Sequence, residues 1–223
     1  MIRSDREKVF ASIRNGLRGK FSREFKRSES SPLRRVPPAD FESCYELFRK
    51  ELDSLGGKAE LASGDEMLEK YIAENTDPDT PTFVDEETAS RRPGLVSRIG
   101  ERIKIRAGAD FERGYDKLAA ACFDAAVVSC EACVAETGTV VFAGGMRLPA
   151  AFTTKLFVVA ERRRLVPTLD EIFMGDLRSH NGSNLFLVTG PSRTADIEKE
   201  LVKGVHGPRE VHVLFLNQVE GEI

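Results

Sequence analysis

The chain has 223 residues, enough for one sizeable α/β domain or two small ones. Apolar residues make up 41% and charged residues 31%, the balance of a soluble globular protein, and no apolar run approaches the roughly 18 residues of a membrane-spanning helix. The charged start, MIRSDREKVF, lacks the apolar stretch of a signal peptide, and four cysteines are too few for a disulfide scaffold of this size. These features predict a cytoplasmic protein without a membrane segment.

The net charge of −3 is unevenly distributed along the chain. Residues 1–35 hold eleven Lys and Arg against four Asp and Glu, so the rest of the chain carries a net charge of −10. A basic arm on an acidic body is compatible with nucleic-acid binding. We favour a solvated amphipathic helix and a linker, because only Phe21 and Phe25 supply aromatic side chains that could stack on bases. We therefore expect no nucleic-acid partner.

The first predicted element is a helix in this basic arm. A Ser-x-x-Glu capping box begins at Ser4, and apolar residues recur at helical spacing as far as Leu17. Residues 21–40 are rich in Arg, Ser and Pro, which predicts a linker. The sequence thus predicts an N-terminal helical arm and linker at residues 1–38 and an α/β domain at 39–223. The arm can dock on its own molecule or on a second copy, which would form a homo-oligomer.

Strand and helix patterns alternate in the next part of the chain. Residues 41–55 carry an apolar stripe at helical spacing and are followed by two glycines. Residues 58–62 predict a strand, 63–72 a helix capped by Ser63, and 81–85 a second strand. Strand, helix and strand in this order indicate a parallel βαβ unit rather than hairpins.

In the second half of the chain, predicted strands and helices follow one another at shorter intervals. The step Glu136-Thr137-Gly138-Thr139 separates two β-prone runs and predicts a tight bend or bulge between strands. Thr168 is the expected cap of a helix. The predicted strands are 124–129, 140–143, 156–160, 184–189 and 211–216, and the predicted helices are 167–173 and 196–203. Together these elements predict an α/β fold.

The segment that follows the strand 184–189 is the strongest candidate for chemistry. Gly190 and Pro191 end the strand, and Ser192 or Thr194 can cap the next helix, whose free N–H groups suit an anion. Arg193 adds a guanidinium with bidentate geometry for a carboxylate or phosphate. The alternative is structural: Ser192, Thr194 and Asp196 only cap the helix, and Arg193 pairs with Asp196 or Glu198.

His206 lies between two glycines and a proline and is therefore expected on a loop. It is a candidate for proton transfer, and the alternative is a hydrogen bond that fixes the loop. His180 and His212 are weaker candidates.

Cys130 and Cys133 form a single CxxC pair, which raises the question of a metal or redox site. One pair supplies two ligands, fewer than the four thiolates that a [4Fe–4S] cluster usually needs. The neighbouring valines favour the alternative, in which both sulfurs are small core residues. We expect no metal site and no bound cofactor.

Two motifs carry a family resemblance. GPSRTADIEKELVKGVHGP, from Gly190, resembles the C-terminal signature of the LUD-domain family, in particular its lactate-utilisation protein C group. AETGTVV, from Ala135, resembles a second signature of that family, an acid-Thr-Gly-Thr step after a strand. The motifs lie about fifty residues apart in the family's order, and the resemblance covers roughly residues 80–218.

The resemblance implies a fold similar to the sugar-isomerase/CoA-transferase type, an α/β fold with a mostly parallel, twisted sheet and helices on both faces. In that superfamily a glutamate at a strand end can attack a CoA thioester, which makes Glu136 a candidate nucleophile by analogy. The alternative is a carboxylate that caps a neighbouring helix or pairs with Arg193. If the strand ends converge, the two motifs share one cleft and bind an anion there. The expected ligand-binding residues are Thr137, Gly138, Thr139, Ser192, Arg193, Thr194 and Asp196.

The resemblance also implies a function. The chain is expected to be the cluster-free subunit of an iron–sulfur L-lactate oxidation system, where it binds a small anionic ligand or organises the iron–sulfur partner subunits. One alternative is an acyl- or CoA-transferase with Glu136 as nucleophile, and another is a non-catalytic adaptor. No GxGxxG fingerprint appears in the sequence, so hydride transfer by this chain alone is not expected.

Overall fold

The computed structural model describes residues 40–107, 123–143, 153–174, 185–194, 202–203 and 207–217. These all belong to one unit of the chain, Pro37–Ile223. The predicted arm helix lies outside the described residues, and the domain boundary at residue 38 stays a prediction. Within the described ranges, no helix is both long and apolar enough to cross a membrane.

The described part of the chain is built around a six-stranded sheet in which every neighbouring pair is parallel. Its three central strands, residues 210–216, 155–161 and 125–129, are largely apolar runs, as expected of strands buried on both faces. In spatial order the six strands are β1 (Lys58–Ala62), β12 (Glu210–Leu216), β7 (Lys155–Glu161), β4 (Ala125–Ser129), β2 (Thr82–Val84) and β3 (Ile105–Ala107). The predicted α/β class with a mostly parallel sheet is confirmed.

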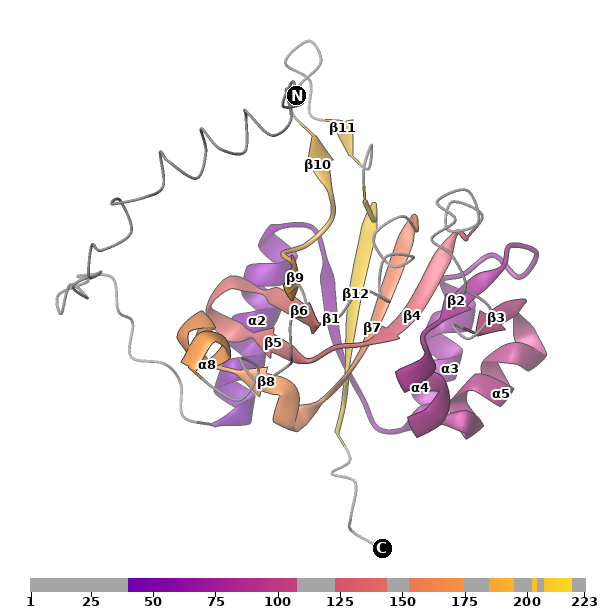
Figure 1. Cartoon of the computed structure of the whole chain (residues 1–223), viewed down its shortest axis with the longest axis horizontal. Helices are drawn as coiled ribbons and strands as arrows, with labels where there is room; N and C mark the ends of the chain where they lie inside the picture. The colour runs from indigo at the N-terminus through magenta and orange to yellow at the C-terminus, as the bar shows by residue number, and fades with distance from the viewer. Residues whose placement is uncertain are drawn as a thin grey trace, which may run out of the picture. The chain divides into compact units, whose positions relative to one another are not determined.

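Helices cover both faces of this sheet (Figure 1). On one face lies α2 (Phe41–Ser54), and on the other lie α3 (Asp65–Glu74), α4 (Glu86–Arg91) and α5 (Pro93–Arg102). The central strand β7 divides its side chains between the two layers: Leu156 and Val158 join the core beneath α2, whereas Phe157 and Val159 join the core beneath α3 and α5. This alternation is the period-2 pattern of a strand buried on both sides.

A second sheet packs on the α2 side (Figure 1). It contains the predicted strands 140–143 and 184–189, which the sequence did not assign to a separate sheet. Its strands, in spatial order, are β8 (Leu165–Val166), β5 (Ala132–Val134), β6 (Thr139–Ala143) and β9 (Leu185–Val188). The pairs β5–β6 and β6–β9 are antiparallel. The turn between β5 and β6 is the 3₁₀ helix η2 (Ala135–Thr137), and Gly138 follows it with φ +61°. The helices η4 (Arg162–Arg164) and α8 (Leu169–Met174) flank β8.

Two details of the predicted elements at 58–85 need correction. The strands β1 and β2 lie in one parallel sheet, but β12, β7 and β4 separate them, so they are not neighbours. Ser63 does not cap α3: the helix begins at Asp65 with Gly64 at the cap position, and the Ser63 hydroxyl contacts Met67 Sδ at 4.0 Å instead.

The predicted helix at 196–203 is wrong at its end. Val202–Lys203 forms strand β11, which pairs antiparallel with β10 (Arg193–Thr194). Because Thr194 pairs with Val202 in this ladder, its backbone is extended where a helix cap was expected. Asp196 lies outside the described residues.

Candidate functional site

The two sequence motifs meet at the C-terminal end of α2. A Cβ atom at Gly138 would lie 2.6 Å from the backbone N of Leu52, so only glycine permits this close approach. The Arg193 guanidinium donates to the carbonyl of Leu55 at 2.6 Å. Both motifs therefore pack against the last turn and C-cap of the same helix.

A chain of hydroxyl groups joins the two motifs. Thr137 Oγ1 donates to Thr139 Oγ1 at 2.8 Å, and Thr139 Oγ1 is hydrogen-bonded to Thr189 Oγ1, also at 2.8 Å. The antiparallel pairing of β6 with β9 places these residues side by side. The motifs thus adjoin through the second sheet, and not through converging ends of parallel strands as the sequence argument assumed.

Glu136 and Arg193 contact different elements. Glu136 Oε1 accepts a hydrogen bond from the backbone N–H of Leu169 at 2.7 Å, and the Glu136 N–H donates to the Pro167 carbonyl at 3.1 Å. This is the helix-capping alternative, since Leu169 is the first residue of α8. Arg193 contacts the end of α2 instead.

The remaining predicted site residues form no helix N-terminus within the described ranges. The Ser192 N–H donates to the carbonyl of Pro208 at 2.8 Å, and Thr194 lies in β10. His206 and His180 lie outside the described residues. His212 is buried in β12, and its Nδ1 is 2.9 Å from the hydroxyl of Tyr71.

Both cysteines of the CxxC pair are buried in the core beneath α2, and their sulfurs lie 3.7 Å apart. Burial raises the pKa of the Cys133 thiol well above its usual value, and the contact with Cys130 acts in the same direction. Across the described ranges, no group of three or more His, Cys, Asp or Glu could hold a metal ion. The geometry agrees with the core interpretation of the pair.

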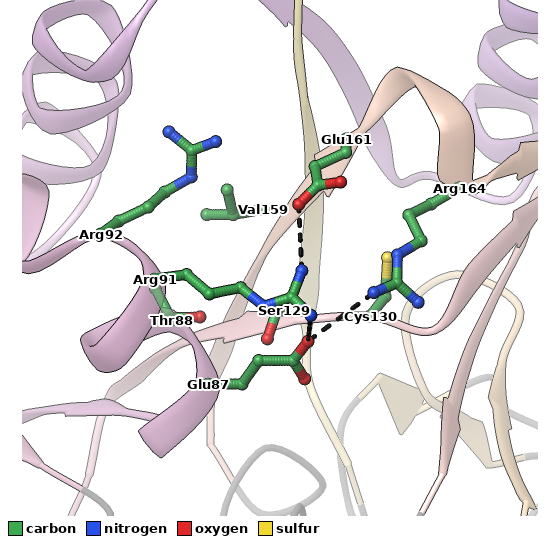
Figure 2. Close-up of a pocket in the computed structure, with 9 residues that line it drawn as sticks. All are labelled: Glu87, Thr88, Arg91, Arg92, Ser129, Cys130, Val159, Glu161 and Arg164. Carbon is green, nitrogen blue, oxygen red and sulfur yellow. Dashed lines mark hydrogen bonds and ion pairs between the residues drawn. The ribbon is translucent and has the colours of Figure 1, made fainter. Parts of the chain in front are cut away.

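The described residues contain a polar pocket that the motifs did not indicate (Figure 2). It is an open pocket at the carboxyl ends of β2, β4 and β7. In parallel α/β sheets, this edge is where ligands bind. The residues that line it are Glu87, Thr88, Arg91, Arg92, Ser129, Cys130, Val159, Glu161 and Arg164.

Arginines and glutamates alternate around this pocket (Figure 2). Arg91 Nη2 lies 3.2 Å from Glu87 Oε1, and Arg91 Nη1 lies 3.1 Å from Glu161 Oε1. Arg164 Nη2 is 3.8 Å from the same Glu87 oxygen. Arg92 is paired with Asp65 at 2.7 Å. Three arginines and two glutamates line the pocket. Arg164, like Arg92, also pairs with a carboxylate outside the lining, because its Nη1 lies 3.1 Å from Glu131 Oε2.

The charge of Glu161 is stabilised by its arginine neighbours. Burial alone would raise the pKa of this carboxyl. The hydrogen bond from Arg163 and the charges of Arg163, Arg91 and Arg164 outweigh burial, so the pKa of Glu161 lies below its usual value. Glu161 is therefore ionised at neutral pH.

Asp85 fixes the base of the pocket. It caps α4 by accepting from the Thr88 N–H at 2.9 Å, and it accepts from the Ser129 hydroxyl at 3.0 Å. The side chain of Asp85 is buried, and this pair of bonds ties the end of β2 to the end of β4. Thr88 itself is 2% exposed, and its hydroxyl has no hydrogen-bond partner.

Sequence reasoning missed this pocket, although a signal was present. Each of three predicted strands is followed directly by polar residues: Asp85 to Thr88 after the first, Ser129 at the end of the second, and Glu161 to Arg164 after the third. The carboxyl ends of parallel strands meet at one edge of a sheet. Assigning these strands to one parallel sheet would have brought the polar residues together.

By its fold and its pocket, the chain is a parallel α/β-domain protein with a charged pocket at the carboxyl edge of its sheet. A family model described as the LUD domain matches residues 45–216. The chain belongs to the LUD-domain family, which confirms the resemblance in the sequence.

Two relatives match parts of the chain. The chain is 30% identical over 157 residues to the lactate utilization protein C of Halalkalibacterium halodurans, covering 65% of this chain and 63% of that protein. It is 30% identical over 114 residues to an uncharacterized protein of Neisseria meningitidis serogroup B, covering 48% and 49%. The matched region thus spans less than two thirds of either relative.

The fold is similar to that in a crystal structure of a DUF162 family protein from Deinococcus radiodurans, with a TM-score of 0.59 and 17% identity. That match covers 80% of this chain and 99% of the other. It shows a common fold.

Proposed function

We propose that this chain is a cluster-free component of an iron–sulfur L-lactate oxidation system, in which it binds a small anion. The observation that carries this proposal is the 30% identity to lactate utilization protein C, within a chain whose LUD domain extends over residues 45–216. Partner subunits would hold the clusters and transfer the electrons.

The pocket supports the anion-binding part of the proposal. Arg91, Arg92 and Arg164 bring three guanidinium groups to one cavity at the carboxyl edge of the sheet. Guanidinium groups suit carboxylates because their planar N–H donors match two carboxylate oxygens. Arg91 and Arg164 are held in place by Glu87, so these donors are ordered before a ligand arrives.

The cysteines support assigning the clusters to partners. Cys130 and Cys133 pack among apolar residues of the core, and burial raises the pKa of Cys133, which disfavours the thiolate that iron requires. A cluster at this pair would need two further ligands and an opening of the core.

The transferase alternative depends on a free carboxylate at Glu136. Its Oε1 instead accepts a hydrogen bond from the Leu169 N–H, which lowers the nucleophilicity of the carboxylate and gives it a structural role. We therefore do not adopt Glu136 as a nucleophile.

Gene deletion tests the proposal. A strain without this chain should fail to grow on L-lactate as sole carbon source and should grow normally on pyruvate. Wild-type protein and Glu136→Gln protein should both restore growth on L-lactate. Unimpaired growth of the deletion strain on L-lactate would contradict the proposal, and failure of only the Glu136→Gln protein would favour the transferase.

A further inference from the structure

We infer that this chain forms a two-fold dimer in which the edge strand β1 pairs antiparallel with β1 of a second copy, centred on Ala59. The two six-stranded sheets then join into one. The observation that carries the inference is the order of charges along β1, because Lys58 and Glu60 complement a second copy of themselves in this register alone. The inference is independent of the proposed function.

The strand β1 has a free edge. It lies at one end of the six-stranded sheet and, among the described strands, pairs only with β12 (Figure 1). The Ala62 carbonyl accepts from the Asn217 N–H at 2.9 Å, so the backbone groups of Ala62 face the β12 side. Because the backbone groups of successive strand residues point to opposite sides, those of Ala59 and Leu61 point away from β12. The Ala59 carbonyl accepts from the Tyr45 hydroxyl at 3.1 Å and has a second lone pair for a further strand.

Two opposite charges lie on one face of this edge strand. Lys58 and Glu60 are two residues apart, so their side chains point to the same face of the sheet. Both side chains are exposed, and neither forms an ion pair within the described part of the chain. Opposite charges that face each other across two antiparallel strands stabilise the pairing, and like charges destabilise it. The charges of β1 can therefore select a partner strand and its register.

One register of a two-fold pair satisfies both charges. Residues that face each other in an antiparallel pair lie on the same face of the sheet, so the two-fold axis passes through one residue. With the axis at Ala59, each Lys58 faces Glu60 of the other copy, and two ion pairs form. With the axis at Lys58 or at Glu60, two like charges meet. With the axis at Leu61, neither charge faces its opposite.

The same register covers an exposed apolar side chain. Leu61 is 37% exposed in the single chain. With the axis at Ala59, it faces Gly57 of the second copy, where no side chain opposes it. Burial of this leucine at the junction would remove apolar surface from water and favour the dimer.

The opposite edge of the sheet lacks this complementarity. There β3 carries Arg106, and Lys104 lies two residues before it on the same face. Any antiparallel register that brings these side chains together sets positive charges against each other. Charges of one sign protect an edge strand from pairing. The two edges of the sheet therefore differ, and only β1 is built to pair with itself.

Sedimentation velocity of the full chain over a range of concentrations tests the inference. The strand β1 has five residues, and pairing through it alone buries less area than a standard interface, so the wild type should show a reversible monomer–dimer equilibrium. About 1 M salt should shift this equilibrium towards the monomer, because exposed ion pairs are screened. Lys58→Glu and Glu60→Lys should each weaken dimerisation about tenfold or more, since like charges then face each other.

Arg98→Glu and Glu101→Lys are the matched controls. They reverse exposed charges of the same kinds on α5, which Figure 1 shows on the far side of the sheet from β1. Both proteins should dimerise as the wild type does. Weaker dimers in these controls would attribute the effect to net charge and overturn the assignment to β1.

Mixing the two single variants is the sharpest step. The two carboxylates of the Lys58→Glu chain then face the two lysines of the Glu60→Lys chain, so the mixture should form a heterodimer of about wild-type affinity. The double variant Lys58→Glu/Glu60→Lys should dimerise on its own for the same reason. Both rescues would show that the single variants are folded and that the register is centred on Ala59.

Three results would overturn the inference. A wild type that stays monomeric at every concentration would show that the charges of β1 guard the edge instead. A dimer that neither single variant weakens would place the interface elsewhere. Failure of the mixture and of the double variant to dimerise would exclude the register centred on Ala59.

Discussion

The Glu136 carboxylate accepts a hydrogen bond from the backbone N–H of Leu169 at 2.7 Å, and the Glu136 N–H donates to the Pro167 carbonyl at 3.1 Å. These two bonds connect the β5–β6 turn to the start of α8. The free N–H groups at a helix start are favourable partners for a carboxylate. These are the contacts of a helix-capping carboxylate, the structural alternative for the acidic residue of the AETGTVV motif.

Removing this cap should destabilise the protein. Glu136→Ala should lower the free energy of unfolding by about 1 kcal/mol, the usual effect of losing a helix cap. Glu136→Gln should cost less, because its amide oxygen can still accept the bond. Urea unfolding measures both changes. Wild-type stability in Glu136→Ala would show that the bond to Leu169 contributes nothing.

Gly138 should tolerate no side chain. Gly138→Ala would require φ near +61° and would place Cβ 2.6 Å from the backbone N of Leu52, so unfolding free energy should fall by more than about 1 kcal/mol. Gly94→Ala is the control: Gly94 lies in α5 with open space around it, and alanine there should be neutral or stabilise by about 0.5 kcal/mol. Equal stabilities of the two variants would contradict the close approach of the turn to α2.

Much of the fold could be predicted from the sequence because each central strand is an apolar run. Residues 124–129 and 156–160 are such runs, and the structure places β4 and β7 there. The position of β12 between β1 and β7 could not be predicted, because buried parallel strands have similar apolar faces and local patterns do not encode their order. The predicted helix at 196–203 was wrong at its end for a related reason: Val202 suits a helix stripe and a strand equally, and pairing with Thr194 decided the outcome.

His212 should make stability depend on pH. Burial lowers the pKa of His212 below its ordinary value of 6.5, Lys58 and Lys155 act in the same direction, and the hydrogen bond and charge of Glu210 oppose them. The unfolded chain therefore takes up a proton near pH 6.5, whereas the folded protein does so only at lower pH. Stability should fall as the pH is lowered from about 6.5 towards the folded pKa, by about 1.4 kcal/mol for each unit of difference between the two pKa values.

Urea unfolding between pH 7.5 and 5 compares the wild type with His212→Gln. The variant should lose less stability on acidification, because it has no imidazole to protonate. Glu210→Gln should lose more than the wild type, since it removes the carboxylate that opposes the shift. Identical pH profiles for the wild type and His212→Gln would contradict the assignment.

The buried cysteines should resist modification. Cys44, Cys130 and Cys133 are buried, and burial raises the pKa of Cys44 and Cys133, so little thiolate is available at neutral pH. Mass spectrometry after iodoacetamide treatment should show slow labelling of these three residues in the folded protein and rapid labelling in urea. The purified chain should also lack stoichiometric iron. Rapid labelling of Cys133 under native conditions, or several irons per chain, would contradict the core assignment.

Less of the candidate site than of the fold could be predicted from the sequence. The GPSRT segment was interpreted as a helix start, but the Ser192 N–H is bound to the Pro208 carbonyl and Arg193 extends to Leu55. Both partners are remote in sequence, so spacing could not reveal them. The sequence could not single out Thr88 either, because the lack of a hydrogen-bond partner for its hydroxyl depends on the three-dimensional packing. Only the family signature could be recognised directly; the match to the family model confirmed it, but it did not locate the pocket.

Reconstitution of L-lactate oxidation tests the central claim most directly. The full chain would be mixed with the purified iron–sulfur subunits of the same organism, and L-lactate-dependent reduction of a dye would be followed with each component omitted in turn. The account predicts that omission of this chain abolishes lactate-dependent reduction, although the chain carries no cluster, and that adding it back restores the rate. An undiminished rate in its absence would contradict the claim that the chain is a component of the system.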